Sequence, residues 1–315
     1  MINRTTVRTR VVQTLFAYYQ DEEKTPLTAR KELLKSYADT YNLYFLLLDF
    51  ANELTAYAQT SIDEMQARAK ATHTPYQTNL RFVDNRFASQ VFHDNALRNH
   101  LEQQHLSWDA GHSAVVSVYK ALLNMDAYKD YMAQREVSYE DDKALWRRIY
   151  TDLLPDNEDM LSALDEMELK LDGGNWTTDL NMVLSYIVKT VKRSRSGEPL
   201  PLLPMFDNEP EVNFGPELLS YAIEHRPEYD ELIARHLKNW EADRVAYMDK
   251  IILYIALAEI EHFPEIALQV SLNEYIEMAK EFSGEKSHLF INGILNEILL
   301  ELRDGNKLLK AASLR

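Results

Sequence analysis

The stretch Val270-Ser-Leu-Asn-Glu-Tyr-Ile-Glu-Met-Ala-Lys-Glu-Phe-Ser-Gly-Glu-Lys-Ser-His-Leu-Phe-Ile-Asn-Gly-Ile-Leu-Asn296 predicts two helices joined by a short turn. Ser271 and Glu274 have the Ser-x-x-Glu spacing of a capping box, in which each side chain bonds a backbone N–H that the start of a helix leaves free. Gly284 suits the left-handed conformation that often closes a helix. We therefore expect the first helix to begin at Ser271 and to end at Gly284.

Both helices of this stretch have an apolar face. Leu272 and Ile276 in the first helix, and Ile294 and Ile298 in the second, recur at helical spacing and are expected to be buried. The pair Asn292-Gly293 departs from this pattern, because a glycine inside a helix costs about 1 kcal/mol relative to alanine. Close approach of a neighbouring helix is the simplest compensation, so we expect Gly293 to pack against one.

The composition of the chain limits its class. The 315 residues contain no Cys and only eight Gly, and the formal net charge is -16. Disulfides, thiolate metal sites and cysteine nucleophiles are excluded. The sequence has few runs of β-branched residues in alternation, which is the pattern typical of strands, so the fold is expected to be all-α. The chain has neither a secretory signal nor a long apolar span, which predicts a cytoplasmic protein with no membrane contact.

The N-terminus carries Arg4, Arg8 and Arg10 without an acidic residue and then runs into an amphipathic helix. Two interpretations are open for these arginines: solvated terminal charges, or an arm that binds phosphates. The helix that follows places Phe16 on its apolar side, together with Val12, Leu15 and Tyr19.

The middle of the chain also reads as helical. Residues 27–70 form one long periodic segment, and residues 138–172 are strongly acidic, as expected of a solvated helix face. A helix ending in Lys189, Lys192, Arg193 and Arg195 has two interpretations: charges that complement the helix dipole, which we favour, or a second phosphate or partner patch. Four histidines, His93, His100, His105 and His112, lack the spacing of a helical metal site, so no metal and no cofactor are expected.

Residues 196–216 hold five of the ten prolines and read as a linker. The expected organisation is an N-terminal helical region over residues 1–210 and a C-terminal helical bundle over residues 211–315. The apolar run from Ile251 to Ile260, which contains one charged residue and stops before Pro264, predicts a buried helix in the second region.

Two blocks of sequence carry a resemblance to a known family. The C-terminal block comprises Trp240-x-x-x-Arg244, Asp249-Lys-Ile-Ile-Leu-Tyr-Ile-Ala-Leu-Ala-Glu259, Asn273-Glu274-x-Ile276-x-x-Ala279-Lys280-x-Phe282 and Ser287-His288-x-Phe290-Ile291-Asn292-Gly293-Ile294-Leu295. The N-terminal block is Arg4-x-x-x-Arg8-x-x-Val11-Val12-Gln13-x-Leu15-Phe16. Together these blocks resemble the NusB transcription antitermination factor family. Family members are usually less than half this length, so the residues between about 21 and 211 resemble a large helical insertion, an extended first half, or both.

The resemblance implies helical bundles of the NusB type with an extended helical middle region. It also implies a non-catalytic factor that binds boxA-type single-stranded RNA together with the ribosomal protein NusE. Such a factor promotes read-through in ribosomal RNA operons and meets other Nus factors and RNA polymerase indirectly. By position, the resemblance implies RNA contacts at Arg4, Arg8, Lys286 and Phe290, with Arg10 an additional arginine of this sequence. It assigns the partner surface to Phe16, Asp243 and Asp249.

Two other classes of function are an RNA-modifying enzyme and a protein-interaction scaffold. A related helical module precedes an RNA cytosine methyltransferase domain, but that chemistry uses a cysteine, and this chain also lacks a glycine-rich cofactor loop. We therefore expect no enzyme activity. The alternative to an antitermination factor is a helical protein-interaction scaffold that has lost RNA binding.

Overall fold

The computed structural model describes residues 1–170, 174–237 and 245–305, and over these ranges the chain forms helices and no strand. The predicted all-α class is therefore confirmed. The chain divides into two compact units. Unit 1 comprises Met1–Lys35 and Phe206–Arg315, and unit 2 comprises Ser36–Met205.

This division differs from the expected regions 1–210 and 211–315. The boundary after Met205 lies close to the expected one, but the first 35 residues belong with the C-terminal helices. The physical reason is the apolar face of the first helix: Val7, Val11, Val12 and Leu15 are fully buried. Without the C-terminal helices that face would be exposed to water.

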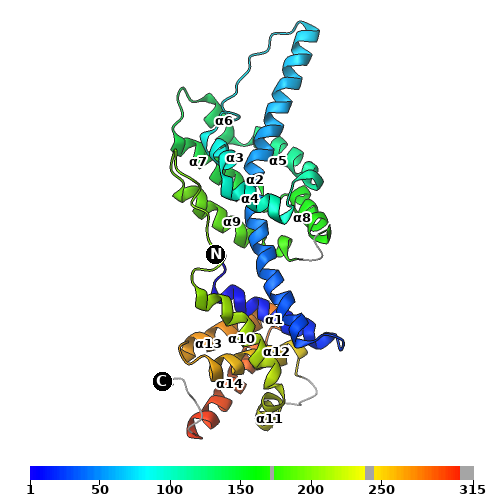
Figure 1. The fold of residues 1–315 in the computed structure, drawn as a ribbon, viewed down its shortest axis with the longest axis vertical. Coiled ribbons are helices and arrows are strands. Elements are labelled where there is room, and N and C mark those ends of the chain that lie inside the picture. The colour runs from blue at the N-terminus through cyan, green and yellow to red at the C-terminus, as the bar shows by residue number, and fades with distance from the viewer. Residues whose placement is uncertain (171–173, 238–244, 306–315) are drawn as a thin grey trace. The chain divides into compact units, whose positions relative to one another are not determined.

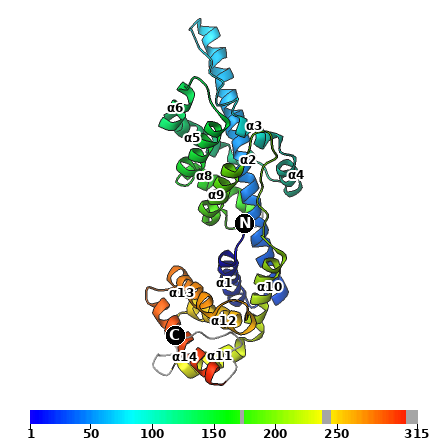
Figure 2. The same ribbon diagram turned by 90° about the vertical axis from the view of Figure 1, so that its left-hand side faces the viewer.

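Unit 1 is a bundle around one fully buried helix. Its helices are α1 (Arg4–Gln20), the first residues of α2 (Pro26–Thr72), α10 (Glu209–Glu224), α11 (Arg226–His236), α12 (Tyr247–His262), α13 (Leu268–Phe282) and α14 (Ser287–Asp304). Helix α12 contacts α1, α10, α11, α13 and α14 (Figure 1, Figure 2). Every residue from Ile251 to Ile260 is buried, as the apolar run predicts.

Unit 2 is organised around the part of α2 that begins at Ser36. Its other elements are α3 (Arg86–His93), α4 (Asn95–Gln104), η1 (Asp109–Gly111), α5 (His112–Asn124), α6 (Asp126–Ala133), α7 (Tyr139–Arg148), the π-helical turn η2 (Ile149–Leu153), α8 (Glu158–Lys170) and α9 (Trp176–Arg193). Residues 43–48 of α2 are all buried. The indole of Trp108 donates to the Leu46 carbonyl at 2.9 Å, and the Tyr150 hydroxyl donates to the Leu47 carbonyl at 3.1 Å.

Helix α13 begins at Leu268, three residues before the predicted start at Ser271. Ser271 is fully buried and donates a hydrogen bond to Glu259 at 2.6 Å, so it does not cap the helix. The predicted capping box is therefore wrong. Gly284 does not close the helix in a left-handed conformation either. Helix α13 ends at Phe282, the next residue Ser283 is extended, and Gly197 is the glycine with positive φ among the described residues.

The second helix of the opening stretch also differs from expectation at one position. Leu272, Ile294 and Ile298 are buried as predicted, and Ile276 is half-buried. Gly293 is exposed, and a Cβ atom built on it meets no atom within 4 Å. The expected close approach of a neighbouring helix is therefore wrong.

The predicted linker over residues 196–216 ends earlier than expected, because α10 begins at Glu209. The Asn208 side chain accepts from the Glu211 N–H at 3.2 Å and caps the helix. Pro210 lies in the first turn, where a missing N–H costs nothing, and Pro216 lies inside the helix.

The four histidines of the middle region take local structural roles. The His100 ring stacks on Phe45 with centroids 3.8 Å apart, and His105 adopts the left-handed conformation that ends α4. Within residues 1–170, 174–237 and 245–305, His, Cys, Asp and Glu form no group of three or more that could hold a metal ion. No helix in the same ranges is long and apolar enough to span a membrane.

Candidate RNA and partner interface

The residues expected to form a basic arm belong to the first turns of α1. The Asn3 side chain accepts from the Thr6 N–H at 2.9 Å, and this cap starts the helix at Arg4. The helical spacing then separates the three arginines according to which side of α1 each occupies. They do not form one exposed cationic surface.

Arg8 lies in the core of unit 1. Its Nε donates to Glu259 Oε2 at 2.6 Å, and its Nη2 donates to Glu259 Oε1 at 3.0 Å, with Glu274 3.4 Å from Nη1. The Arg8 side chain is 2% exposed and the Glu259 side chain is fully buried. This guanidinium is not accessible to RNA in the structure, which instead gives Arg8 a role in joining α1 to α12 and α13.

Glu259 is the centre of this buried network. Besides Arg8, it accepts hydrogen bonds from the Ser271 hydroxyl at 2.6 Å and the Tyr275 hydroxyl at 2.8 Å. Burial raises the pKa of the carboxyl, but the hydrogen bonds and charge of Arg8, with the two hydroxyls, outweigh burial and hold the pKa below its ordinary 4.5. The carboxylate therefore stays ionised and compensates the Arg8 charge.

Arg4 and Arg10 differ from Arg8 in their surroundings. The Arg4 Nε contacts both carboxylate oxygens of Glu211 at 3.1 Å, and its guanidinium lies 5.1 Å from the centre of the Phe214 ring. The Arg4 side chain is 31% exposed. Arg10 is buried and donates to Gln13 at 2.9 Å. Of the three arginines, Arg4 is the one that the surrounding solvent reaches.

The second predicted RNA block lies at the start of α14. Lys286 is exposed and precedes the first residue of the helix. Phe290, one turn later, is buried, while its neighbour Leu289 is 62% exposed. Lys286 and Leu289 are thus available at this edge, whereas the Phe290 ring packs inside the bundle.

The predicted partner surface around Phe16 is rich in aromatic rings. Half-buried Phe16 meets the Tyr247 ring edge-on, with centroids 5.7 Å apart, and Tyr247 is 38% exposed. Nearby on α1, Tyr19 lies beneath the Arg226 guanidinium at 4.3 Å. Tyr and Arg side chains are enriched at the centres of protein interfaces, so this patch has the composition of a docking surface.

The two predicted partner aspartates do not both reach that surface. Asp249 is 5% exposed and accepts hydrogen bonds from the Ser283 hydroxyl at 2.6 Å and the Ser287 hydroxyl at 3.0 Å. It thereby joins the start of α12 to the turn between α13 and α14. Asp243 lies outside the described residues.

Sequence reasoning missed the acidic partners of the arginines, Glu211 and Glu259. A signal for the second was present, since Glu259 is the one charged residue in the apolar run 251–260. A carboxylate inside such a run has to find a cation or a set of hydrogen-bond donors. The pairing of Glu211 with Arg4 had no comparable signal, because both lie on partly exposed helix faces.

The C-terminal part of the chain is similar in sequence to known proteins. The NusB family model matches residues 190–299. The transcription antitermination protein NusB of Bacillus subtilis (strain 168) is 40% identical over 92 residues, which cover 29% of this chain and 70% of that protein. The protein of the same name from Myxococcus xanthus (strain DK1622) is 38% identical over 91 residues, with 29% of this chain and 65% of that protein covered.

A third relative of the same name, from Bacillus velezensis, is 41% identical over 96 residues, which cover 30% of this chain and 74% of that protein. Among solved structures, T. maritima NusB is 26% identical, with 45% of this chain and 85% of that chain covered and a TM-score of 0.29.

Proposed function

The chain belongs to the NusB family, and from this membership we propose that it is a non-catalytic transcription antitermination factor that binds boxA-type single-stranded RNA together with the ribosomal protein NusE. In this role it promotes read-through in ribosomal RNA operons and meets RNA polymerase and other Nus factors indirectly. The similarity to proteins named as transcription antitermination factors, over 70% of the length of one of them, carries the proposal.

The RNA surface that we propose in unit 1 consists of Arg4 and Lys286, with Leu289 as an exposed apolar neighbour. Single-stranded RNA needs a few cations for its phosphates and flat or apolar groups for its bases. Arg8 and Arg10 support this surface from inside the bundle, and the buried Phe290 shapes the edge at which Lys286 stands. With so few phosphate contacts, the affinity of the chain alone is expected to be weak.

The partner surface that we propose is the aromatic patch of Phe16, Tyr247, Tyr19 and Arg226. The net charge of -16 favours a basic partner, because complementary charge speeds association and limits wrong pairings. Asp249 supports this surface by fixing the start of α12, and Asp243 is proposed as a direct contact on the resemblance alone.

A titration of labelled boxA RNA, followed by fluorescence anisotropy with and without the ribosomal partner, tests the proposal. We expect the partner to increase RNA affinity and a scrambled RNA to bind more weakly. Indifference to both RNA sequence and partner would overturn the antitermination role.

One observation favours the second candidate, a protein-interaction scaffold without RNA binding: two of the three N-terminal arginines are buried. The variant Arg4→Ala/Lys286→Ala separates the candidates. Unchanged RNA affinity with a fully retained protein complex would favour the scaffold, whereas loss of RNA affinity with a retained protein complex supports the RNA-binding factor.

A further inference from the structure

Unit 2 contains an open pocket of about 620 Å³ that the proposed function does not use. Its lining comes from three places in the chain: α3 with the start of α4, Tyr139 at the start of α7, and the segment 196–199. Pockets that bind small groups have volumes of roughly 300–1,000 Å³, so this one has room for a nucleobase with its sugar.

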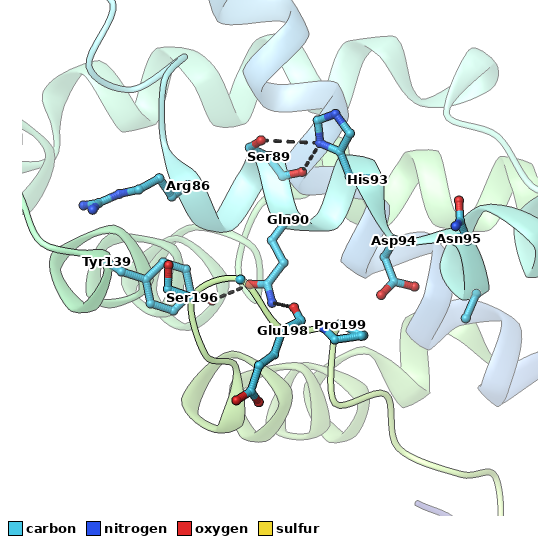
Figure 3. A pocket seen from close by; sticks show the side chains of 12 residues that line it. Arg86, Ser89, Gln90, His93, Asp94, Asn95, Tyr139, Ser196, Glu198 and Pro199 are labelled. Atoms are coloured by element: carbon cyan, nitrogen blue, oxygen red, sulfur yellow. Dashed lines mark hydrogen bonds between the residues drawn. The ribbon is translucent and has the colours of Figure 1, made fainter.

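Hydrogen bonds within the pocket wall hold its shape. Gln90 extends from α3 to residues 195–198, where its amide donates to the carbonyls of Arg195 and Glu198. Its own carbonyl accepts from the Tyr139 hydroxyl (Figure 3). On the other side, the buried Asp94 accepts from the N–H groups of Leu97 at 2.9 Å and Leu200 at 3.0 Å. Both side chains are occupied in framing the pocket. The flat group in its wall is the half-buried ring of Tyr139, which has the Lys143 ammonium 5.4 Å from its centre.

The rim of the pocket continues into the basic end of α9. Lys189, Lys192, Arg193 and Arg195 are all exposed, and Arg195 immediately precedes the lining residue Ser196. Within the described residues, Lys189, Lys192 and Arg193 make no ion pair, and Arg195 lies 3.9 Å from Glu198. In a chain with a net charge of -16, four exposed cations in seven residues form a local excess of positive charge.

A cation from a neighbouring helix also binds the C-terminal end of α9. The buried Lys143 donates to the carbonyls of Lys192 at 3.3 Å and Ser194 at 2.9 Å, so a cation from α7 already satisfies the C-terminal end of α9. Lys192 and Arg193 lie in the last turn of α9, where their charge complements the helix dipole while their side chains stay exposed. Arg195 directly precedes the lining residue Ser196, and its carbonyl accepts from Gln90 of the pocket wall. Positive charge at this end of α9, next to a pocket with an aromatic wall, suits a ligand that carries a row of phosphates and a flat group.

We propose that this pocket and the exposed cations at the end of α9 form a second binding site for single-stranded RNA. One base enters the pocket against Tyr139, and the phosphates beside it lie on Lys192, Arg193 and Arg195. Glu198 and the buried Asp94 are the carboxylates of the pocket lining, and Glu140, which follows Tyr139 in the sequence, pairs with Lys143 at 2.9 Å. The choice of RNA over other phosphodiesters rests on the proposed function.

Anisotropy titrations of the full chain with a short labelled single-stranded RNA, at a series of salt concentrations, test the site. The variant K192A/R193A/R195A is compared with K120A/K129A/K170A, which removes the same charge from exposed lysines elsewhere in unit 2. Because each single-strand phosphate contact contributes about 0.7 to the slope of log affinity against log salt, the first variant is expected to lower that slope by about 2 and the second to leave it unchanged.

A second variant tests the pocket without changing charge. Ser196 is an exposed residue of the pocket lining. In Ser196→Trp, the new indole is expected to fill the space that the base occupies in our proposal. Loss of one stacked base is expected to weaken RNA binding about fivefold or more. Circular dichroism and urea unfolding of each variant verify that the helices are retained.

The outcomes separate this site from the proposed function. If RNA affinity is the same in K192A/R193A/R195A as in its charge-matched control, or unchanged in Ser196→Trp, the site in unit 2 is overturned. RNA binding that depends on Arg4 and Lys286 but not on the α9 cations leaves the antitermination proposal standing and removes only this inference. RNA binding that depends on the α9 cations but not on Arg4 and Lys286 supports the site in unit 2 and contradicts the RNA surface proposed in unit 1.

Discussion

The guanidinium of Arg8 in α1 and the carboxylate of Glu259 in α12 form a buried, two-bond ion pair, with distances of 2.6 and 3.0 Å. Their positions are 251 residues apart in the chain, and the pair closes unit 1 by attaching the N-terminal helix to the centre of the bundle. An arginine that sequence resemblance assigns to RNA thus holds the fold together.

Arg8→Ala is expected to destabilise the chain by about 3–5 kcal/mol, because it leaves the Glu259 charge buried and uncompensated. The matched control is Arg4→Ala, whose ion pair with Glu211 is partly exposed and is worth roughly 1 kcal/mol or less. Urea unfolding followed by circular dichroism measures both. Equal losses from the two variants would contradict a structural role for Arg8. The double variant Arg8→Met/Glu259→Leu is expected to recover part of the lost stability but not all of it, because the buried hydroxyls of Ser271 and Tyr275 then lose their acceptor.

Stability is expected to depend on pH through Glu259. The pKa of this carboxyl is held below its ordinary 4.5 in the folded chain, so folding is favoured by ionisation. Its contribution is complete above about pH 4.5 and is lost as the pH falls through the lower, folded pKa. Free energies of unfolding measured from neutral to acidic pH are therefore expected to fall more steeply for the native chain than for Arg8→Met/Glu259→Leu. Parallel curves would show that other carboxyls dominate.

Gly293→Ala is expected to stabilise the chain by about 1 kcal/mol, because the glycine lies inside α14, exposed and without a neighbour. Gly111→Ala provides the opposite case, since its Cβ would lie 2.5 Å from the Trp108 ring. That substitution is expected to cost about 1–3 kcal/mol through overpacking. Thermal unfolding compares the two, and a destabilised Gly293→Ala would indicate that an added methyl group meets a constraint within the folded chain.

Asp249→Ala is expected to destabilise the chain by about 1–3 kcal/mol, because the hydroxyls of Ser283 and Ser287 lose their acceptor. Asp249→Asn retains one acceptor oxygen and is expected to lose less. Unfolding in urea gives the stability of each variant. If Asp249→Asn abolished binding of the ribosomal partner at unchanged stability, Asp249 would have a direct contact role instead.

Lys286→Ala is expected to weaken RNA binding and to reduce the dependence of log affinity on log salt by about 0.7, the contribution of one single-strand phosphate. Lys280→Ala is the control, since Lys280 lies on the neighbouring helix α13, is similarly exposed and pairs with Glu277. Anisotropy titrations with boxA RNA at several salt concentrations give both slopes. A slope that Lys286→Ala leaves unchanged would remove this lysine from the RNA surface.

Periodicity alone determined much of this protein. The long helix from Pro26 to Thr72, the buried run from Ile251 to Ile260 and the burial of Leu272, Ile294 and Ile298 follow from apolar residues at helical spacing. Such spacing works because it reports which face of a helix leaves water, and that preference acts on each segment independently of the rest of the chain.

The tertiary structure decided which partner each polar residue contacts. Ser271 and Glu274 have the spacing of a local cap, yet in the folded chain Ser271 donates to Glu259 and Glu274 lies beside Arg8. Local spacing cannot separate these roles, because a carboxylate or hydroxyl bonds whichever donor or acceptor the fold brings within about 3 Å. The same holds for the basic end of α9, where Lys143 from another helix satisfies the carbonyls and leaves Lys192 and Arg193 exposed. The sequence by itself determined which segments are helical and apolar, whereas the partners of each charge depended on contacts between segments far apart in the chain.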